Sequence, residues 1–125
     1  PVGLNQVIDL LHYEEEPFSV VSILNDRPAD GTDVSWIWDG NYEKFLDFDI
    51  PKVTVSGIRQ KELTLRMKVA GIPEDELEVV PEISDVIKTF KNAPTKKIYV
   101  MATYTAVLQL RKELANQGYI AERMK

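Results

Sequence analysis

With 125 residues and 44% hydrophobic content, the chain has the size of one domain and enough apolar residues to bury a core. The formal net charge of −5 and the isoelectric point near 4.9 argue against two partners, nucleic acid and anionic lipid, because both are bound by basic surfaces. The absence of cysteine and the single histidine, His12, exclude disulfides, thiolate metal sites and histidine-rich metal sites from this sequence. No apolar run approaches the roughly 20 residues that cross a bilayer, and no basic-then-apolar leader precedes the first helix, so we expect a cytoplasmic setting.

The sequence begins with Pro1 rather than methionine, and an amphipathic pattern follows at once. We therefore expect residues 1–125 to be a single domain cut from a longer polypeptide, rather than a chain with a processed start.

Apolar residues alternate between helical and strand spacing along the chain. The run at residues 18–24 is continuously apolar or β-branched, which is typical of a strand buried on both faces. Gly71 and Gly118 are placed to end helices, and Ser84 to cap one. In chain order, the predicted elements are helix 3–13, strand 18–24, helix 42–46, strand 52–56, helix 59–70, strand 77–80, helix 84–90, strand 97–101 and helix 105–116.

This alternation, with short connections, predicts an α/β fold: a Rossmann-like, three-layer domain whose mostly parallel sheet has helices on both faces. Ligands and partners of such sheets sit beyond the carboxyl ends of the strands. Three segments lie there, residues 25–39, 57–59 and 102–104. None contains GxGxxG or GxxxxGK[ST], so the fold alone does not indicate a nucleotide enzyme.

The segment 25–39 stands out because it holds four carboxylates within fourteen positions and both tryptophans of the chain. Trp36 and Trp38 would face the same way if the segment were extended. Two interpretations remain open for the indoles: they pack on the edge of the core, or they anchor a partner, since tryptophan is enriched at interface hot spots.

The carboxylates also allow two interpretations. Asp26 and Asp30 can close local turns, and Asp33 can cap a helical turn that contains Trp36. Asp39 differs, because it follows the two indoles and precedes a glycine. With no base or nucleophile nearby in sequence, it would act only by orienting a histidine of another chain, which is the role of the acid in a nucleophile–His–Asp triad.

The other two strand ends give weaker signals. Arg59 at a helix start would bind a phosphate or carboxylate, or would simply be an exposed first-turn arginine. Thr103 and Tyr104 would line a cleft, or Thr103 would only cap the last helix. His12 is expected at a helix end without a catalytic role.

Several stretches occur in an order that spans nearly the whole chain: PVGLN at residues 1–5, NDRPADGTDVSWIWD at 25–39, GIR at 57–59, LRMKVAG at 65–71, and TYTA at 103–106 with LR at 110–111. Together they resemble the C-terminal domain of the MurT family, the Mur-ligase-like subunit of lipid II isoglutaminyl synthase.

The resemblance implies a function that composition does not show. Members of the family form a complex with GatD, a glutaminase that releases ammonia with a cysteine and a histidine. MurT activates the α-carboxylate of D-glutamate in lipid II with ATP, and ammonia converts it to D-isoglutamine at the inner face of the membrane. The C-terminal domain contacts GatD and supplies an aspartate to its triad.

On this resemblance, Asp39 is the expected acid and Asp33 the runner-up, while Asn25, Asp30, Trp36 and Trp38 are expected to bind the partner. Arg59, Thr103 and Tyr104 are expected to face the substrate or nucleotide cleft. ATP, Mg²⁺ and a zinc ribbon are expected in a central domain that this sequence lacks, so the chain by itself should be inactive and hold no cofactor or metal. The alternative is a non-catalytic module that binds a small anion, a nucleotide or another protein.

Overall fold

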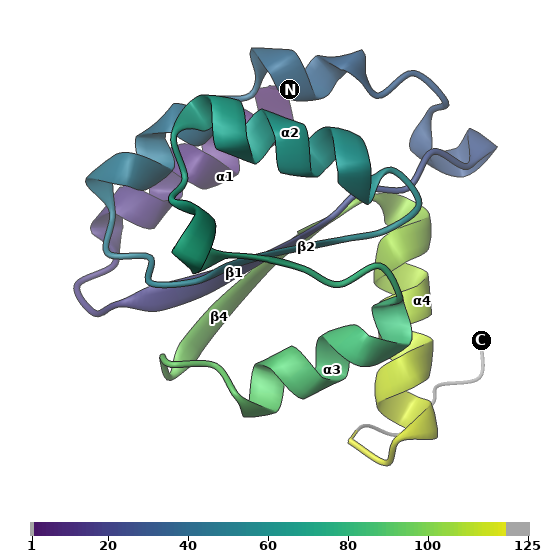
Figure 1. The fold of residues 1–125 in the computed structure, drawn as a ribbon. Helices are drawn as coiled ribbons and strands as arrows, with labels where there is room; N and C mark the ends of the chain where they lie inside the picture. The colour runs from purple at the N-terminus through teal and green to yellow at the C-terminus, as the bar shows by residue number, and fades with distance from the viewer. Residues whose placement is uncertain (1, 120–125) are drawn as a thin grey trace.

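The computed structural model describes residues 2–119 as an α/β sandwich of three layers (Figure 1). Within these residues, four parallel strands form one sheet in the order β3-β2-β1-β4. The strands are β1 (Phe18–Ile23), β2 (Val53–Ser56), β3 (Leu77–Val79) and β4 (Lys97–Ala102). The α-helices are α1 (Val2–Leu10), α2 (Gln60–Ala70), α3 (Ile83–Lys91) and α4 (Tyr104–Asn116). The predicted fold class is confirmed.

The core lies on both faces of β1, because side chains of a strand alternate between the faces of a sheet. Val20 packs with the cluster under α1 and α2, whereas Val21 and Ile23 pack with the cluster under α3 and α4. Every residue of β1 is buried, as its unbroken apolar run predicts. Figure 1 shows the same arrangement, with α1 and α2 on one face of the sheet and α3 and α4 on the other.

The predicted helix and strand bounds are right to within one to three residues, with two differences in detail. The first predicted helix ends its α-helical part at Leu10 and continues as the 3-10 helix η1 (Leu11–Tyr13). Ser84 does not cap α3, because the helix begins at Ile83 and places Ser84 inside its first turn. The N-cap position belongs to Glu82, whose side chain makes no capping hydrogen bond.

The segment 25–39 is folded into short 3-10 helices, η2 (Pro28–Asp30) and η3 (Ser35–Asp39), and η4 (Tyr42–Asp47) follows. Trp36 and Trp38 were expected to face the same way only if the segment were extended, and this condition is not met. A 3-10 helix has three residues per turn and directs residues i and i+2 to different sides. Asp33 Oδ1 accepts the Ser35 amide proton at 2.9 Å, which favours the turn over an extended strand.

The strand order places this segment where the chain changes direction in the sheet. After β1, the chain adds β2 and β3 on one side and then crosses to add β4 on the other. The carboxyl ends of β1 and β4 thus form the topological switch point, the usual position of functional sites in open parallel sheets. Residues 25–39 leave the sheet at this point.

Candidate functional site

Asn25 joins the end of β1 to three other parts of the chain. Its Nδ2 donates hydrogen bonds to Thr105 Oγ1 at 3.0 Å and Gln109 Oε1 at 2.9 Å in α4, and its Oδ1 accepts the Ile58 amide proton at 3.0 Å. Its own amide donates to Thr103 Oγ1 at 3.0 Å. Asn25 is only 1% exposed, so it shapes the start of the segment and offers no side-chain group to a partner in this conformation.

Asp30 caps α4 from a distance in sequence. Its two carboxylate oxygens accept hydrogen bonds from the amide and the hydroxyl of Thr105, at 2.7 and 2.5 Å, and one also accepts from the Arg27 amide at 3.0 Å. Burial raises the pKa of Asp30, but these hydrogen bonds outweigh it and hold the pKa below the usual aspartate value. The carboxylate therefore serves as the N-terminal cap, which was one of the two roles considered for Thr103, since the Thr103 hydroxyl is bonded to Asn25 instead.

Two further aspartates are also engaged inside the chain. Asp26 Oδ2 accepts a hydrogen bond from Arg59 Nη1 at 3.0 Å, and the same guanidinium pairs with Glu62. These two carboxylates raise the pKa of Arg59, Glu62 more than Asp26. The Ser35 backbone and hydroxyl lower the pKa of Asp33. The charge of Arg59 is thus already paired with two carboxylates of this chain.

Asp39 is the exception among the four aspartates. It is exposed at the end of η3, and its carboxylate makes no hydrogen bond or ion pair with any residue between 2 and 119. Its backbone carbonyl accepts a hydrogen bond from Asn5 Nδ2 at 3.2 Å. Asp39 therefore combines a free carboxylate with a fixed backbone.

The turn that carries Asp39 rests on a buried arginine to which the sequence analysis assigned no role. Arg66, 3% exposed, donates from Nε to the Ile37 carbonyl at 2.9 Å and from Nη2 to the Gly40 carbonyl at 2.7 Å. The sequence spacing already places this arginine on the buried face of α2, because Leu63, Arg66, Met67 and Ala70 follow the i, i+3, i+4, i+7 pattern. A charged residue at such a position needs buried partners.

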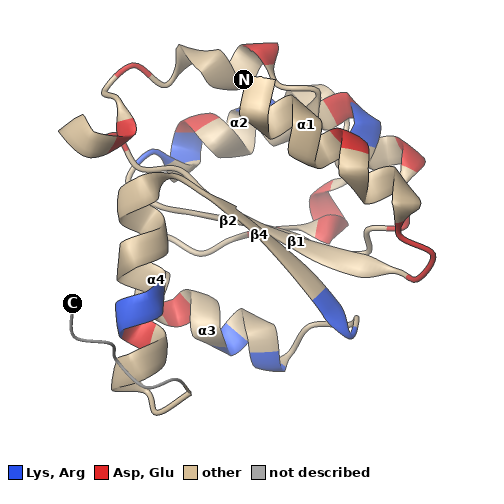
Figure 2. Cartoon of the chain, turned by 180° about the vertical axis from the view of Figure 1, so that it is seen from behind, with Lys and Arg blue, Asp and Glu red and all other residues tan. Residues whose placement is uncertain are grey.

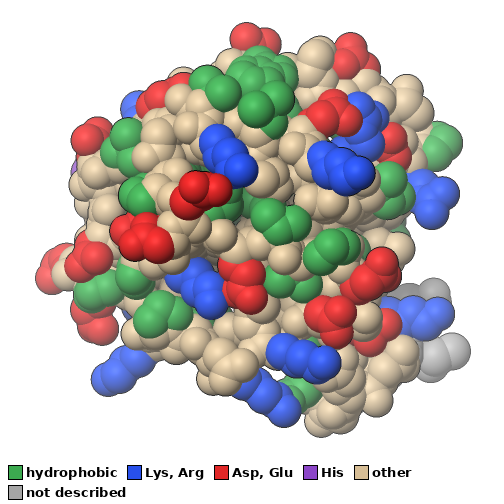
Figure 3. Space-filling model, viewed as in Figure 1, with side chains coloured by type: hydrophobic (Ala, Val, Ile, Leu, Met, Phe, Trp, Pro, Cys, Tyr) green, Lys and Arg blue, Asp and Glu red, His purple; other side chains and the backbone are tan. Residues whose placement is uncertain are grey.

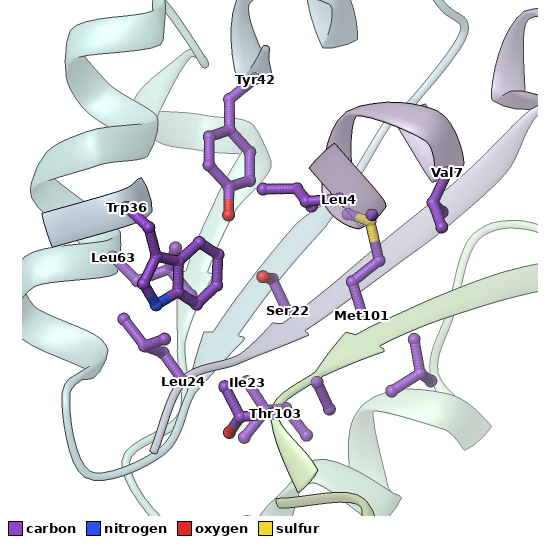
Figure 4. Close-up of a pocket in the computed structure, with 13 residues that line it drawn as sticks. Leu4, Val7, Ser22, Ile23, Leu24, Trp36, Tyr42, Leu63, Met101 and Thr103 are labelled. Carbon is purple, nitrogen blue, oxygen red and sulfur yellow. The ribbon is translucent and has the colours of Figure 1, made fainter. Parts of the chain in front are cut away.

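The indoles of Trp36 and Trp38 have different surroundings. Trp36 is partly buried and packs against the core, lining a pocket of about 360 Å³ with Tyr42, Leu4 and Met101. Figure 4 shows the Trp36 indole and the Tyr42 ring on one side of this pocket and Leu4 with Met101 on the other. Trp38 is 46% exposed, and its ring centroid lies 5.4 Å from the guanidinium carbon of Arg66. One indole thus packs on the core edge and the other is available on the surface.

Thr103 and Tyr104 lie at the same end of the sheet as the start of segment 25–39. Thr103 follows β4 directly, where its amide donates to the Ile23 carbonyl at 3.2 Å, and Tyr104 begins α4 with its side chain exposed. His12 lies in η1 beside the Asp9 carbonyl, separate from the segment 25–39. The cleft roles of Arg59, Thr103 and Tyr104 stay predictions.

Charge is unevenly distributed over the chain. Figure 2 shows acidic residues mainly in the loops on the α1 side of the sheet, while lysines lie at the start of β4 and on α3. On the face seen in Figure 3, acidic, basic and hydrophobic side chains are interspersed.

Among the described residues, no three His, Cys, Asp or Glu side chains are placed to hold a metal ion, and no helix is long and apolar enough to cross a membrane.

Together, fold and site define a class: a parallel α/β domain in which the segment leaving the switch point ends in a hydrogen-bonded 3-10 turn. This turn carries the exposed indole of Trp38 next to Asp39, whose carboxylate is unbonded within residues 2–119. The family model described as MurT ligase C-terminal matches residues 1–107, and the chain belongs to this family.

Two relatives agree with this assignment. The lipid II isoglutaminyl synthase (glutamine-hydrolyzing) subunit MurT of Streptococcus pneumoniae is 38% identical over 124 residues, which is 99% of this chain and 28% of the relative. The subunit of the same name from Staphylococcus aureus is 33% identical over 116 residues, 91% of this chain and 26% of the relative. The chain thus spans about a quarter of the length of these curated relatives.

Proposed function

We propose that this chain is the C-terminal domain of a MurT subunit of lipid II isoglutaminyl synthase. In this proposal, the complete enzyme uses ATP and glutamine to amidate the α-carboxylate of D-glutamate in lipid II at the cytoplasmic face of the membrane. The family match and the relatives named as glutamine-hydrolyzing synthase subunits support the assignment. The word subunit in those names implies a partner, for which the glutaminase GatD has the required chemistry.

Within that complex, the domain docks the glutaminase and provides Asp39 as the acid of its cysteine–histidine site. The observation that carries this proposal is the difference among the four aspartates. Asp26, Asp30 and Asp33 are used within the chain, whereas the carboxylate of Asp39 is exposed and has no partner in the part of the chain that is described. A carboxylate that must accept a hydrogen bond from another chain has to be unoccupied in the free subunit.

The role of Asp39 follows from triad chemistry. Its carboxylate accepts the Nδ1 proton of the partner's histidine, fixes the imidazole tautomer and stabilises the imidazolium that forms when the histidine takes a proton. The partner's cysteine is the nucleophile that attacks the glutamine side-chain amide. Asp39 makes and breaks no bond to the substrate, and by itself the chain is inactive because its sequence has no cysteine.

Two features of the chain favour a phosphate site for ATP elsewhere in the complete protein. The sequence has no phosphate-binding loop, and the guanidinium of Arg59 is already paired with Asp26 and Glu62. We therefore assign ATP, Mg²⁺ and zinc to other parts of the complete protein.

The test of the catalytic proposal compares Asp39→Asn with Asp33→Asn in the complete protein bound to its glutaminase. Asp39→Asn keeps the side-chain shape but removes the charge, so the glutaminase kcat should fall roughly 10²- to 10⁴-fold, as in other triads that lose their acid. Asp33→Asn retains an oxygen for the Ser35 amide and should change kcat less than about 3-fold. A larger effect of Asp33→Asn would move the role to that residue, and no effect of either variant would refute the triad role.

The docking part of the proposal has a separate readout. Trp38→Ala removes an exposed indole beside Asp39 and should weaken the complex by about 2 kcal/mol or more if Trp38 is an interface hot spot. Val100→Ala, a truncation of an exposed apolar side chain on β4, is the control. Equal affinities for the parent protein and Trp38→Ala would place the interface elsewhere.

A further inference from the structure

Two side chains hold the backbone around Asp39 and take no part in the function proposed above. They are Asn5, from α1, and Arg66, from α2. Both belong to sequence stretches that the family resemblance covers, yet neither has a chemical role there. Their hydrogen bonds converge on residues 37–41, the turn that ends η3.

Arg66 binds this turn from the core side. Nε donates to the Ile37 carbonyl and Nη2 to the Gly40 carbonyl, one residue before and one after the pair Trp38-Asp39. Nη1 and Nη2 also donate to the two carboxylate oxygens of Glu43, at 3.0 and 2.8 Å, and these bonds lower the pKa of Glu43. The guanidinium carbon lies 5.4 Å from the ring centroid of Trp38 and 5.3 Å from that of Tyr42. Its charge is thus paired with Glu43, and two aromatic rings pack close to it.

Asn5 binds the same turn from the side of α1. Its Nδ2 donates to the Asp39 carbonyl at 3.2 Å, and its Oδ1 accepts the Asn41 amide proton at 2.7 Å. Between them, Asn5 and Arg66 bond the backbone on both sides of Asp39 and leave its carboxylate free. Gly40 completes the turn, because a Cβ there would lie 2.7 Å from Leu4 Cδ2 of α1.

We infer that Asn5 and Arg66 are positioning residues, which fix the direction of the Asp39 carboxylate for the histidine of the partner glutaminase. This inference rests on the function proposed above. Such a carboxylate must be held to within about 0.5 Å, and a displacement of about 1 Å can cost about 10²-fold in rate. An exposed 3-10 turn does not reach this precision unaided, because few contacts restrain it.

The geometry also explains why an arginine is needed. The planar guanidinium serves two carbonyls and one bidentate carboxylate at once, whereas a lysine ammonium has three donors at a single point. Arg66→Lys therefore keeps the charge beside Glu43 but loses the simultaneous bonds to Ile37 and Gly40. The substitution thus weakens the restraint on the turn without changing the net charge.

The test is a double-mutant cycle in the complete protein bound to its glutaminase, with kcat and KM for glutamine as readouts. Arg66→Lys and Asn5→Ala should each lower kcat about 10- to 100-fold and leave KM within about 2-fold, because the acid touches the histidine and not glutamine. In the Asp39→Asn background, neither substitution should lower kcat further, since there is no longer a carboxylate to position.

The control is Lys68→Met, which removes an exposed cation from the same helix, 3.8 Å from Glu74, and should leave kcat unchanged. If Arg66→Lys fails to fold, as judged by its urea midpoint, Asn5→Ala decides the test. Equal losses of kcat in the parent protein and in the Asp39→Asn background, or no loss from either variant, would overturn the positioning role while leaving Asp39 as the acid. If Asp39→Asn itself has no effect, the proposed function fails and the inference fails with it.

Discussion

Four aspartates that look alike in the sequence have different surroundings in the structure. Asp30 caps a helix, Asp26 neutralises Arg59, and Asp33 begins a 3-10 turn. Each of these uses is local chemistry that a turn-rich segment requires. Within residues 2–119, Asp39 is the one of the four whose carboxylate is unbonded, so it is the one that can bind another chain. The functional assignment depends on this difference.

The cap formed by Asp30 predicts a measurable loss of stability. Asp30→Ala leaves the Thr105 amide and hydroxyl without their acceptor, so the free energy of unfolding should fall by about 1–2 kcal/mol at pH 7. Since the pKa of Asp30 is lowered in the folded state, its contribution is present above the unfolded aspartate pKa, near about 3.9, and is lost as the pH falls through the lower folded value.

Urea unfolding at pH 7 and pH 3 would measure this difference. Asp47→Ala is the control, because Asp47 is exposed and makes no ion pair or side-chain hydrogen bond within residues 2–119. If the two variants are equally stable at pH 7, Asp30 does not cap α4.

Tyr42 gives a second prediction for a single residue, at high pH. Burial raises its pKa to about 12, although the charge of Arg66 opposes the shift. The neutral phenol is thus favoured in the folded chain, and the stability linked to this shift is complete below pH 10 and is lost as the pH rises from about 10 to 12.

Replacing Tyr42 by Phe should remove that dependence. Between pH 10 and pH 12, the unfolding free energy of the parent chain should fall more steeply than that of Tyr42→Phe, by about 1.4 kcal/mol per pH unit. Ionisation of the other tyrosines and the lysines contributes to both chains and cancels in the comparison. Parallel curves would mean that Tyr42 ionises at an ordinary pH.

At the scale of elements, the end of β1 is fixed by its approach to the turn before α2. Gly57 has a φ of +104°, and a Cβ there would lie 2.4 Å from the Leu24 carbonyl oxygen. The Arg59 amide donates to the same oxygen at 2.9 Å, and the Ile58 amide donates to Asn25. This close contact aligns the start of segment 25–39 with the start of α2, the helix that carries Arg66.

Alanine at three glycines should therefore have graded effects. Gly57→Ala meets both a positive φ and a backbone clash, and should lower the unfolding free energy by well over the roughly 1–2 kcal/mol of the positive φ alone. Gly31→Ala, at φ +86° and ψ +127° in open space, meets backbone strain without a clash and should cost less than Gly57→Ala. Gly3→Ala, within α1 and also in open space, should stabilise by roughly 0.5–1 kcal/mol. Denaturant unfolding of the three variants gives the order, and equal effects at Gly57 and Gly31 would contradict the close contact.

The sequence predicts the elements well, because their periodicity is strong. The apolar run of β1 and the spaced apolar residues of α2 leave little choice of secondary structure. Segment 25–39 is different: its Pro, Gly and Asp residues indicate turns, but they do not say which acceptor each amide will find. The 3-10 turn that directs Trp36 and Trp38 to different sides could therefore not be predicted.

The candidate site could be predicted only in part, because many of its contacts join residues that are far apart in the sequence. Asp39 and Trp38 were singled out from the sequence, and the structure places both in η3, within the segment that follows β1. The internal bonds of Asn25 and Asp30 depend on α4, which lies about 80 residues further along the chain. No local pattern contains such contacts, nor the bonds from Asn5 and Arg66 to the turn.

At the scale of the whole molecule, the sheet brings distant parts of the chain to the same end. The carboxyl ends of β1 and β4 lie next to each other, and residues from α1, α2 and η3 meet over them. The pocket beside Trp36 lies at this end of the sheet, and the exposed ring of Trp38 lies 5.4 Å from the guanidinium carbon of Arg66 in α2. In the proposed complex, this domain provides Asp39 as the acid, on a turn that Asn5 and Arg66 hold, and the partner chain provides the nucleophile and the base.

The central claim is most directly tested by an experimental structure of the complete protein bound to its glutaminase. The distance to measure is the one between a carboxylate oxygen of Asp39 and the nearest ring nitrogen of the catalytic histidine of the glutaminase. We predict a hydrogen bond of about 2.7–3.2 Å, with residues 37–41 keeping the turn that Asn5 and Arg66 hold. If another acid, Asp33 included, occupies that position, or if Asp39 faces solvent in the complex, the claim is contradicted.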